Sequence, residues 1–282
     1  MADIRIFEMS PRDGLQNEKK QIATADKIKL VDLLSGCGFS HIEVTSFVSP
    51  KAVPQMSDAA EVMAGIARHP DVTYAVLTPN MRGFDGARAA IADEIAVFAS
   101  ASEGFSKANI NATIAESLER FRPVMARAKE EGLKVRGYVS CVTDCPYDGP
   151  VAPAQVAKVA SDLHEMGCYE ISLGDTIGAG TPETIGAMLD AVTQAVPPAA
   201  LAGHYHDTGG RALENIAVSL EHGLTVFDSS AGGLGGCPYA PGAKGNVATE
   251  AVVAMLEERG LSAGIDREKL NVAAQFARGL RS

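Results

Sequence analysis

A chain of 282 residues with 46% hydrophobic content can bury one large core, and few aromatics beside many small aliphatic residues favour α/β packing around a layered aliphatic interior. The formal charge of -10 repels phosphate backbones and argues against nucleic acid as a partner. The sequence shows no apolar run of the roughly 18 to 20 residues that a membrane span needs and no signal peptide at its start, so we expect a cytoplasmic protein with no membrane partner.

Strands and helices are predicted to alternate along the whole chain. Residues 4–8 predict a first strand, which ends in a charged loop at 9–16 because Pro11 and Gly14 forbid its continuation. The further predicted strands are 41–45, 73–77, 94–99, 134–140, 170–173, 201–205 and 226–229. The predicted helices are 25–37, 58–68, 83–92, 114–131, 153–166, 182–195, 211–222, 247–259 and 267–278.

Eight strand–helix units are the number that closes a parallel sheet into a (β/α)8 TIM barrel with its active site at the carboxyl ends of the strands. We therefore expect one domain over 1–282, with a barrel at about 4–259 and a helical extension at about 260–282. A doubly wound open sheet is the alternative, because one or two wrongly predicted strands would change the number of strand–helix units.

The stretch 201–211 (LAGHYHDTGGR) places two histidines near the end of a predicted strand. Its period of two puts His204 and His206 on one face, where two imidazoles could bind a divalent metal. An isolated pair of this kind is more often two core histidines bonded to the backbone. Asp207 faces the other way, which argues for a supporting partner or a helix cap rather than a third ligand.

A barrel brings residues that follow different strands to a single rim. The polar residues and thiol expected there are Arg12, Asp13, Glu43, Thr45, Asp175, His204, His206, Cys237 and Asn246. Asp13, His204, His206 and Asn246 together offer two oxygens and two nitrogens, and would leave positions on a divalent cation open for substrate. Taken singly, Asp13 could form a turn and Asn246 could cap a helix.

The remaining rim residues each have two interpretations. Arg12 could face a developing enolate or carboxylate, or be a solvated surface charge. Glu43 points inward by alternation, where an idle carboxylate would be costly, and Asp175 could function or cap a turn. The Gly-rich segment 232–245 fits no nucleotide motif and suggests a mobile flap that carries Cys237 as a proton donor or acceptor. The other four cysteines lie in or beside apolar segments, and neither disulfides nor a zinc knuckle is indicated.

Three stretches closely resemble the hydroxymethylglutaryl-CoA lyase family: residues 6–16 (IFEMSPRDGLQ), 204–208 (HYHDT) and 228–240 (DSSAGGLGGCPYA). The resemblance implies a TIM barrel, a homodimer and metal-dependent cleavage of 3-hydroxy-3-methylglutaryl-CoA, a CoA thioester, to acetyl-CoA and acetoacetate. It also implies that Mg²⁺ or Mn²⁺ is bound by Asp13, His204, His206 and Asn246. The active-site residues that it implies are Arg12, Glu43, Asp175, His204 and Cys237.

Cleavage requires loss of the C3 hydroxyl proton and a place for charge on the departing thioester enolate. The resemblance assigns the first task to the cation, which lowers the pKa of that hydroxyl, and the second to Arg12. Protons would pass through His204, Asp175 and Cys237, with acid and base not distinguished.

The sequence leaves three alternatives to this activity. Related acyl-CoA-dependent synthases, which make isopropylmalate, homocitrate or citramalate, usually carry glutamate where Leu15 stands and lack the Gly-Gly-Cys-Pro segment, so cleavage is favoured. A lyase of another 3-hydroxyacyl-CoA stays open, and residues 231–233 (AGG) depart slightly from the family's pattern. A non-catalytic metal-binding barrel would have no use for the thiol of Cys237.

Overall fold

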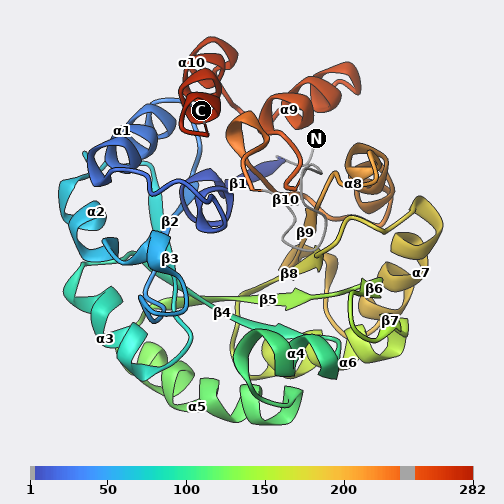
Figure 1. The fold of residues 1–282 in the computed structure, drawn as a ribbon. Coiled ribbons are helices and arrows are strands. Elements are labelled where there is room, and N and C mark those ends of the chain that lie inside the picture. The colour runs from blue at the N-terminus through green and yellow to red at the C-terminus, as the bar shows by residue number, and fades with distance from the viewer. Residues whose placement is uncertain (1–3, 236–244, 282) are drawn as a thin grey trace.

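Eight parallel strands close into a barrel in the computed structural model, which describes residues 4–235 and 245–281 (Figure 1). The spatial order is β1-β10-β9-β8-β5-β4-β3-β2, and pairing of β2 with β1 completes the ring. The barrel strands are β1 (Arg5–Glu8), β2 (His41–Ser46), β3 (Thr73–Leu77), β4 (Glu94–Ser100), β5 (Lys134–Ser140), β8 (Glu170–Asp175), β9 (Leu201–Tyr205) and β10 (Val226–Ser229). The (β/α)8 barrel is confirmed, and the open-sheet alternative is wrong.

Helices surround the strands in Figure 1, and their buried apolar residues join one core with the outward-facing residues of the sheet. Those that match predicted helices are α1 (Thr24–Ser35), α2 (Ala59–Gly65), α3 (Met81–Ala89), α5 (Ile114–Glu130), α6 (Pro153–Glu165), α7 (Pro182–Val192), α8 (Ala212–Glu221), α9 (Thr249–Glu258) and α10 (Arg267–Gly279). Among the described helices, none is long and apolar enough to cross a membrane.

Several short elements were not predicted. They are α4 (Glu103–Ile110), the antiparallel pair β6 (Asp144–Cys145) and β7 (Gly149–Pro150), and the short helical turns η1 (Ser10–Gly14), η2 (Pro54–Met56), η3 (Pro198–Ala200) and η4 (Ala231–Gly233). The turn η1 replaces the loop predicted at 9–16. Pro11 fits its first turn, where an amide hydrogen would be unpaired, and the Gly14 amide donates to the Met9 carbonyl 3.1 Å away.

The two faces of the barrel strands differ in chemistry. Outward residues such as Val76, Ile95 and Leu173 join the large aliphatic core between sheet and helices. Inside, a small cluster that includes Phe7 and Tyr138 lies beside a buried charged network. We define this network, the barrel-floor network, as Arg5, Glu94, Arg136, Glu170 and Asp228. The expected layered aliphatic interior is therefore wrong in the main: most buried aliphatic residues lie between strands and helices, and the inner cluster mixes Ala75, Leu77 and Ala96 with aromatic rings.

The helix α10 forms the predicted C-terminal extension. Its buried face is Leu270, Ala273, Ala274 and Ala277, a spacing that puts all four on one side of the helix. The small alanines allow close approach, and α10 packs against α1, α9 and the turn η4 (Figure 1). The last helix therefore supports the turn that leads into the Gly-rich segment.

Candidate active site

A cleft of about 570 Å³ opens at the carboxyl ends of the strands. Among its lining residues, Arg12, Asp13, His204 and His206 supply charge and metal-binding groups. Its apolar lining residues include Leu77, Phe98, Phe105, Ile110 and Phe121. The barrel therefore brings the polar rim residues to one cavity, as its topology requires.

The turn η1 presents Arg12 and Asp13 to the cleft. It follows β1 directly, and the Met9 amide donates to the Ser229 carbonyl at the end of β10. Gly14 closes the turn where a Cβ atom would lie 2.8 Å from both Leu234 Cβ and Ser230 Oγ. A side chain does not fit there, so glycine allows the turn to lie against residues 230–234.

His204 and His206 lie on one face of β9 and its continuation, with ring centroids 5.5 Å apart. His206 forms an isolated backbone bridge with Asn246, which places the segment before α9 beside the histidines. Asp207 does not join them: its Oδ1 accepts from the Ala212 amide at the start of α8, as expected for a cap. A two-histidine, one-carboxylate site using Asp207 is not formed.

Asp13, His204 and His206 form a group whose candidate ligand atoms all lie within 4.8 Å of one another. Asn246 Nδ2 donates to Asp13 Oδ2 over 2.7 Å, which brings the fourth predicted ligand to the same place. His206 Nδ1 is buried and has no hydrogen-bond partner among the described residues. Such an unsatisfied nitrogen beside a carboxylate fits a divalent cation, which borderline nitrogen and oxygen ligands bind.

The protonation states of these groups also suit a cation. Burial alone would raise the pKa of Asp13, but Arg12 and the two histidines outweigh it and lower that pKa to about 2. Burial, assisted by His204, lowers the pKa of His206 to about 4. For His204, burial acts downward, yet the hydrogen bond to Asp228 and the charges of Asp228 and Asp13 raise the pKa. Near neutral pH the site thus holds an anionic carboxylate and a neutral His206.

Arg12 is buried between two carboxylates. Its Nε donates to Glu43 Oε2 and its Nη1 donates to Asp13 Oδ1, while its guanidinium lies 5.6 Å from the centroid of the Tyr138 ring. Burial of Glu43 raises the pKa of that carboxyl, an effect that Arg12 opposes. Glu43 is 0% exposed and lies behind Arg12 rather than on the cleft wall. The pair holds a fixed positive charge at the cleft.

Asp175 and Thr45 lie elsewhere. Because β8 runs to Asp175, two residues beyond the predicted strand, alternation turns Asp175 away from the cleft that Gly174 lines. Its carboxylate accepts from the Ala179 and Gly180 amides and from Thr143.

A register shift between Glu43 and Thr45 breaks the alternation in β2, so Thr45 contacts Met56 instead of the rim. Cys237 lies outside the described residues.

Two buried residues that support the site were missed at the sequence level. Asp228 accepts from His204 Nδ1, and Arg136 holds Asp228 with two hydrogen bonds. The available signal was a charge at an inward position inside an otherwise apolar strand, in KVRGYVS for Arg136 and VFDS for Asp228. Such charges are buried only when they are paired.

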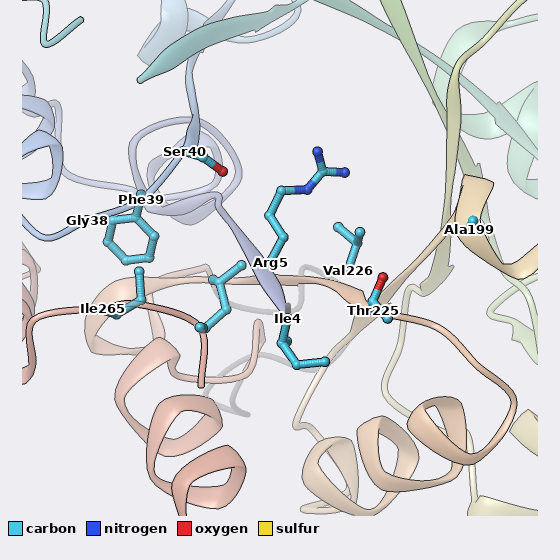
Figure 2. Close-up of a pocket in the computed structure, with 11 residues that line it drawn as sticks. Ile4, Arg5, Gly38, Phe39, Ser40, Ala199, Thr225, Val226 and Ile265 are labelled. Atoms are coloured by element: carbon cyan, nitrogen blue, oxygen red, sulfur yellow. The ribbon is translucent and has the colours of Figure 1, made fainter. Parts of the chain in front are cut away.

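A second cavity of about 460 Å³ lies at the opposite, amino-terminal end of the strands (Figure 2). It is lined by mainly apolar residues such as Ile4, Phe39, Val226 and Ile265. Arg5, the one charged residue on its described wall, pairs with Glu170. The chemistry expected from the sequence is therefore concentrated in the first cavity.

Comparisons with known proteins cover nearly the whole chain. The HMGL-like family model matches residues 3–277. A relative from Pseudomonas aeruginosa, named 3-hydroxy-3-isohexenylglutaryl-CoA/hydroxy-methylglutaryl-CoA lyase, is 57% identical over 96% of this chain and 91% of its own length. Curated relatives at 55–56% identity carry either "mitochondrial" or "cytoplasmic" in their names.

Solved structures agree with these relatives. An HMG-CoA lyase from Brucella melitensis is 63% identical, with a TM-score of 0.99 over 100% of this chain and 99% of that one. An HMG-CoA lyase from Acinetobacter baumannii, solved in complex with coenzyme A and 3-methylmalate, is 37% identical, with a TM-score of 0.94 over 99% of this chain and 91% of that one.

Proposed function

We infer that this chain, which belongs to the HMGL-like family, is a carbon–carbon lyase that cleaves 3-hydroxy-3-methylglutaryl-CoA to acetyl-CoA and acetoacetate. The observation that carries the inference is the group Asp13, His204 and His206, which lines a cleft in a chain similar to such lyases over its full length. The synthases considered above are not favoured by these similarities.

The reaction breaks one carbon–carbon bond without an oxidant. The C3 hydroxyl loses its proton, the C3 carbonyl forms, and the electrons of the C2–C3 bond pass to the thioester as an enolate. A proton then reaches C2 to give acetyl-CoA. The protein must therefore accept one proton, stabilise enolate charge and return one proton.

The proposed ligands of Mg²⁺ or Mn²⁺ are Asp13, His204, His206 and Asn246, and when bound the cation would act as a Lewis acid that acidifies the substrate hydroxyl. Arg12 supplies a fixed charge for the enolate oxygen, and Glu43 keeps its guanidinium oriented at the cleft. The Nε2 atom of His204 lies 3.9 Å from Asp13 Oδ2 and is the proposed ligand atom, so a proton-transfer role for His204 stays a prediction from the sequence.

Two proton-transfer assignments rest on the sequence alone. Cys237 stays a proposed acid or base because of its place in the Gly-rich segment. Asp175 stays a prediction as well, and its hydrogen bonds within the turn before α7 give a structural role that accounts for its burial. Among the described residues, substrate contact is proposed only for those on the cleft wall.

The test is incubation of the purified chain with Mg²⁺ and 3-hydroxy-3-methylglutaryl-CoA. We expect acetoacetate and acetyl-CoA in equal amounts. Asp13→Asn should reduce turnover by at least about 100-fold, because the anionic ligand is lost. Asp207→Asn is the matched control, since it changes a nearby carboxylate that caps α8, and its turnover should stay within a few-fold of the unmodified chain.

If no acetoacetate forms although the chain binds the metal, a non-catalytic metal-binding barrel becomes the better interpretation. The choice between the two metals is tested separately. After chelation, the chain is titrated with Mg²⁺ or Mn²⁺, and the ion that restores turnover at the lower concentration is the preferred one.

A second candidate substrate is a 3-hydroxy-3-methylglutaryl-CoA analogue with a longer apolar branch at C3. The apolar wall of Leu77, Phe98, Phe105 and Phe121 favours it, and the Pseudomonas aeruginosa relative carries 3-hydroxy-3-isohexenylglutaryl-CoA in its name. Comparison of kcat/KM for the two thioesters tests this. A loss of more than about 1,000-fold with the longer branch would exclude it.

Further proposals concern the state of the protein. We propose a homodimer, which sedimentation equilibrium tests, and a single domain over 1–282, for which calorimetry should show one cooperative transition. The cytoplasmic location expected from the sequence stays a prediction, because relatives are named for two compartments.

A further inference from the structure

We propose that Asp228 is a positioning residue that fixes the tautomer and ring orientation of His204, so that His204 Nε2 presents its lone pair to the metal. This inference rests on the metal site proposed above. It concerns a residue inside the barrel, on a strand that contributes no ligand of its own.

The register of the sheet places the two residues side by side. Asp228 on β10 is the direct Cα partner of His204 on β9, and both side chains point into the barrel. Asp228 Oδ2 and His204 Nδ1 are 3.0 Å apart. A carboxylate can only accept, so the hydrogen must be on Nδ1, and Nε2 of the neutral ring is left with its lone pair on the side of Asp13.

Asp228 is itself held rigidly as a carboxylate. Arg136 donates from Nη2 to Oδ1 over 2.7 Å and from Nη1 to Oδ2 over 3.0 Å, a two-point geometry that fixes the carboxylate plane. Ser172 Oγ donates to Oδ2 over 2.8 Å, and Glu170 holds the far side of Arg136. Asp228 is 2% exposed, so water does not compete for these bonds.

The other histidine has no such support. His206 Nδ1 is buried without a hydrogen-bond partner among the described residues, so nothing described there selects its tautomer. The two imidazoles of the site are therefore unequal. The ring of His204 is oriented before a metal binds. The barrel-floor network holds it through one hydrogen bond, from His204 Nδ1 to Asp228.

The test compares Asp228→Asn with Glu170→Gln. Both replace a buried carboxylate partner of Arg136 by an amide of the same shape, but among the two only Asp228 touches His204. An Asn amide can donate to Nδ1 and thereby move the ring hydrogen to Nε2. Affinity for Mn²⁺, measured without substrate by electron paramagnetic resonance, should fall about 10- to 100-fold in Asp228→Asn and stay within about threefold in Glu170→Gln.

Equal losses in the two variants would overturn the proposal, since general damage to the barrel interior would explain them. An unchanged affinity in Asp228→Asn would also overturn it, since the hydrogen bond to His204 would then not affect metal binding. Circular dichroism and thermal unfolding establish that both variants are folded. If Asp228→Asn does not fold, the unmodified chain provides the second measurement. Long-range ¹H–¹⁵N correlation of the metal-free protein, at alkaline pH where the ring is neutral, should show His204 with the hydrogen on Nδ1.

A hydrogen on Nε2 of His204 would refute the assignment whatever the variants do. Neither measurement uses the lyase substrate, so the two hypotheses fail separately. Absence of acetoacetate with the expected Mn²⁺ affinities would remove the proposed function and keep the positioning role. Normal lyase activity with the hydrogen on Nε2 of His204 would remove the positioning role and keep the proposed function.

Discussion

Substitution of Gly14 by alanine should displace the catalytic turn by an amount that the structure defines. The new Cβ would lie 2.8 Å from Leu234 Cβ and 2.8 Å from Ser230 Oγ. Both atoms lie close to their own backbones, so side-chain rotation moves them only a short distance. Ordinary contacts between carbon atoms are about 3.5–4.0 Å, so the turn η1 must withdraw by roughly 1 Å. Asp13 immediately precedes Gly14 and would move with it.

A displacement of this size at a reacting centre typically lowers turnover about 100-fold. Overpacking of a filled interior should also lower the free energy of unfolding by about 1–3 kcal/mol. The assays are the initial rate of acetoacetate formation at saturating metal and urea unfolding followed by circular dichroism. We expect both quantities to fall, with the larger proportional effect on the rate.

Gly186→Ala is the matched control. Gly186 lies inside α7, where an added Cβ would meet its nearest neighbour at 3.7 Å, an ordinary contact. Alanine is favoured over glycine in a helix interior, so this variant should keep its activity and gain about 0.5–1 kcal/mol in stability. Turnover of Gly14→Ala within threefold of the unmodified chain would refute the claim that η1 is held by contact with residues 230–234.

Three further predictions concern stability, pH and metal. Ile91 is 70% exposed and has a φ of 56°, so Ile91→Gly should raise the free energy of unfolding by about 1 kcal/mol in urea titrations, and a decrease would contradict the assigned strain. Burial raises the pKa of Glu8 to about 7 from 4.5, so its stabilising contribution is complete below pH 4.5 and is lost as pH rises through about 7. Between pH 5 and pH 8, the free energy of unfolding of the unmodified chain should therefore fall by about 2 kcal/mol relative to that of Glu8→Gln. A difference between the two proteins that does not change with pH would show that Glu8 does not titrate as described. Chelation should abolish turnover reversibly, and Mn²⁺ at 100 times its Kd should stabilise the fold by about 2.7 kcal/mol, whereas full activity after exhaustive chelation would exclude a metal-dependent reaction.

The barrel could be predicted from the sequence because each strand–helix unit carries its own local pattern. The convergence of Asp13, His204, His206 and Asn246 then required only the rule that parallel strands of a barrel end at one rim. That rule depends on the order of residues along the chain and needs no knowledge of side-chain contacts.

The side-chain positions that could not be predicted depended on register. One irregular residue in β2 turned Thr45 outward, and a strand end two residues later than predicted turned Asp175 away from the cleft. The interior was misjudged for a related reason, since composition gives the number of aliphatic residues but not the face they occupy. The partnership of Arg136 with Asp228 joins residues 92 positions apart and could be seen only in three dimensions.

The closure of the barrel also has a consequence for how the protein folds. β1 pairs with β10 at the join, and Asp13 meets Asn246 across a separation of 233 residues. Contacts of such long range form late, because chain entropy must be lost before they contribute. A refolding chain should therefore acquire secondary structure and helix packing before it can bind a divalent ion tightly. The time at which Mn²⁺ binds during refolding would then report the time at which β1 pairs with β10 and the barrel closes.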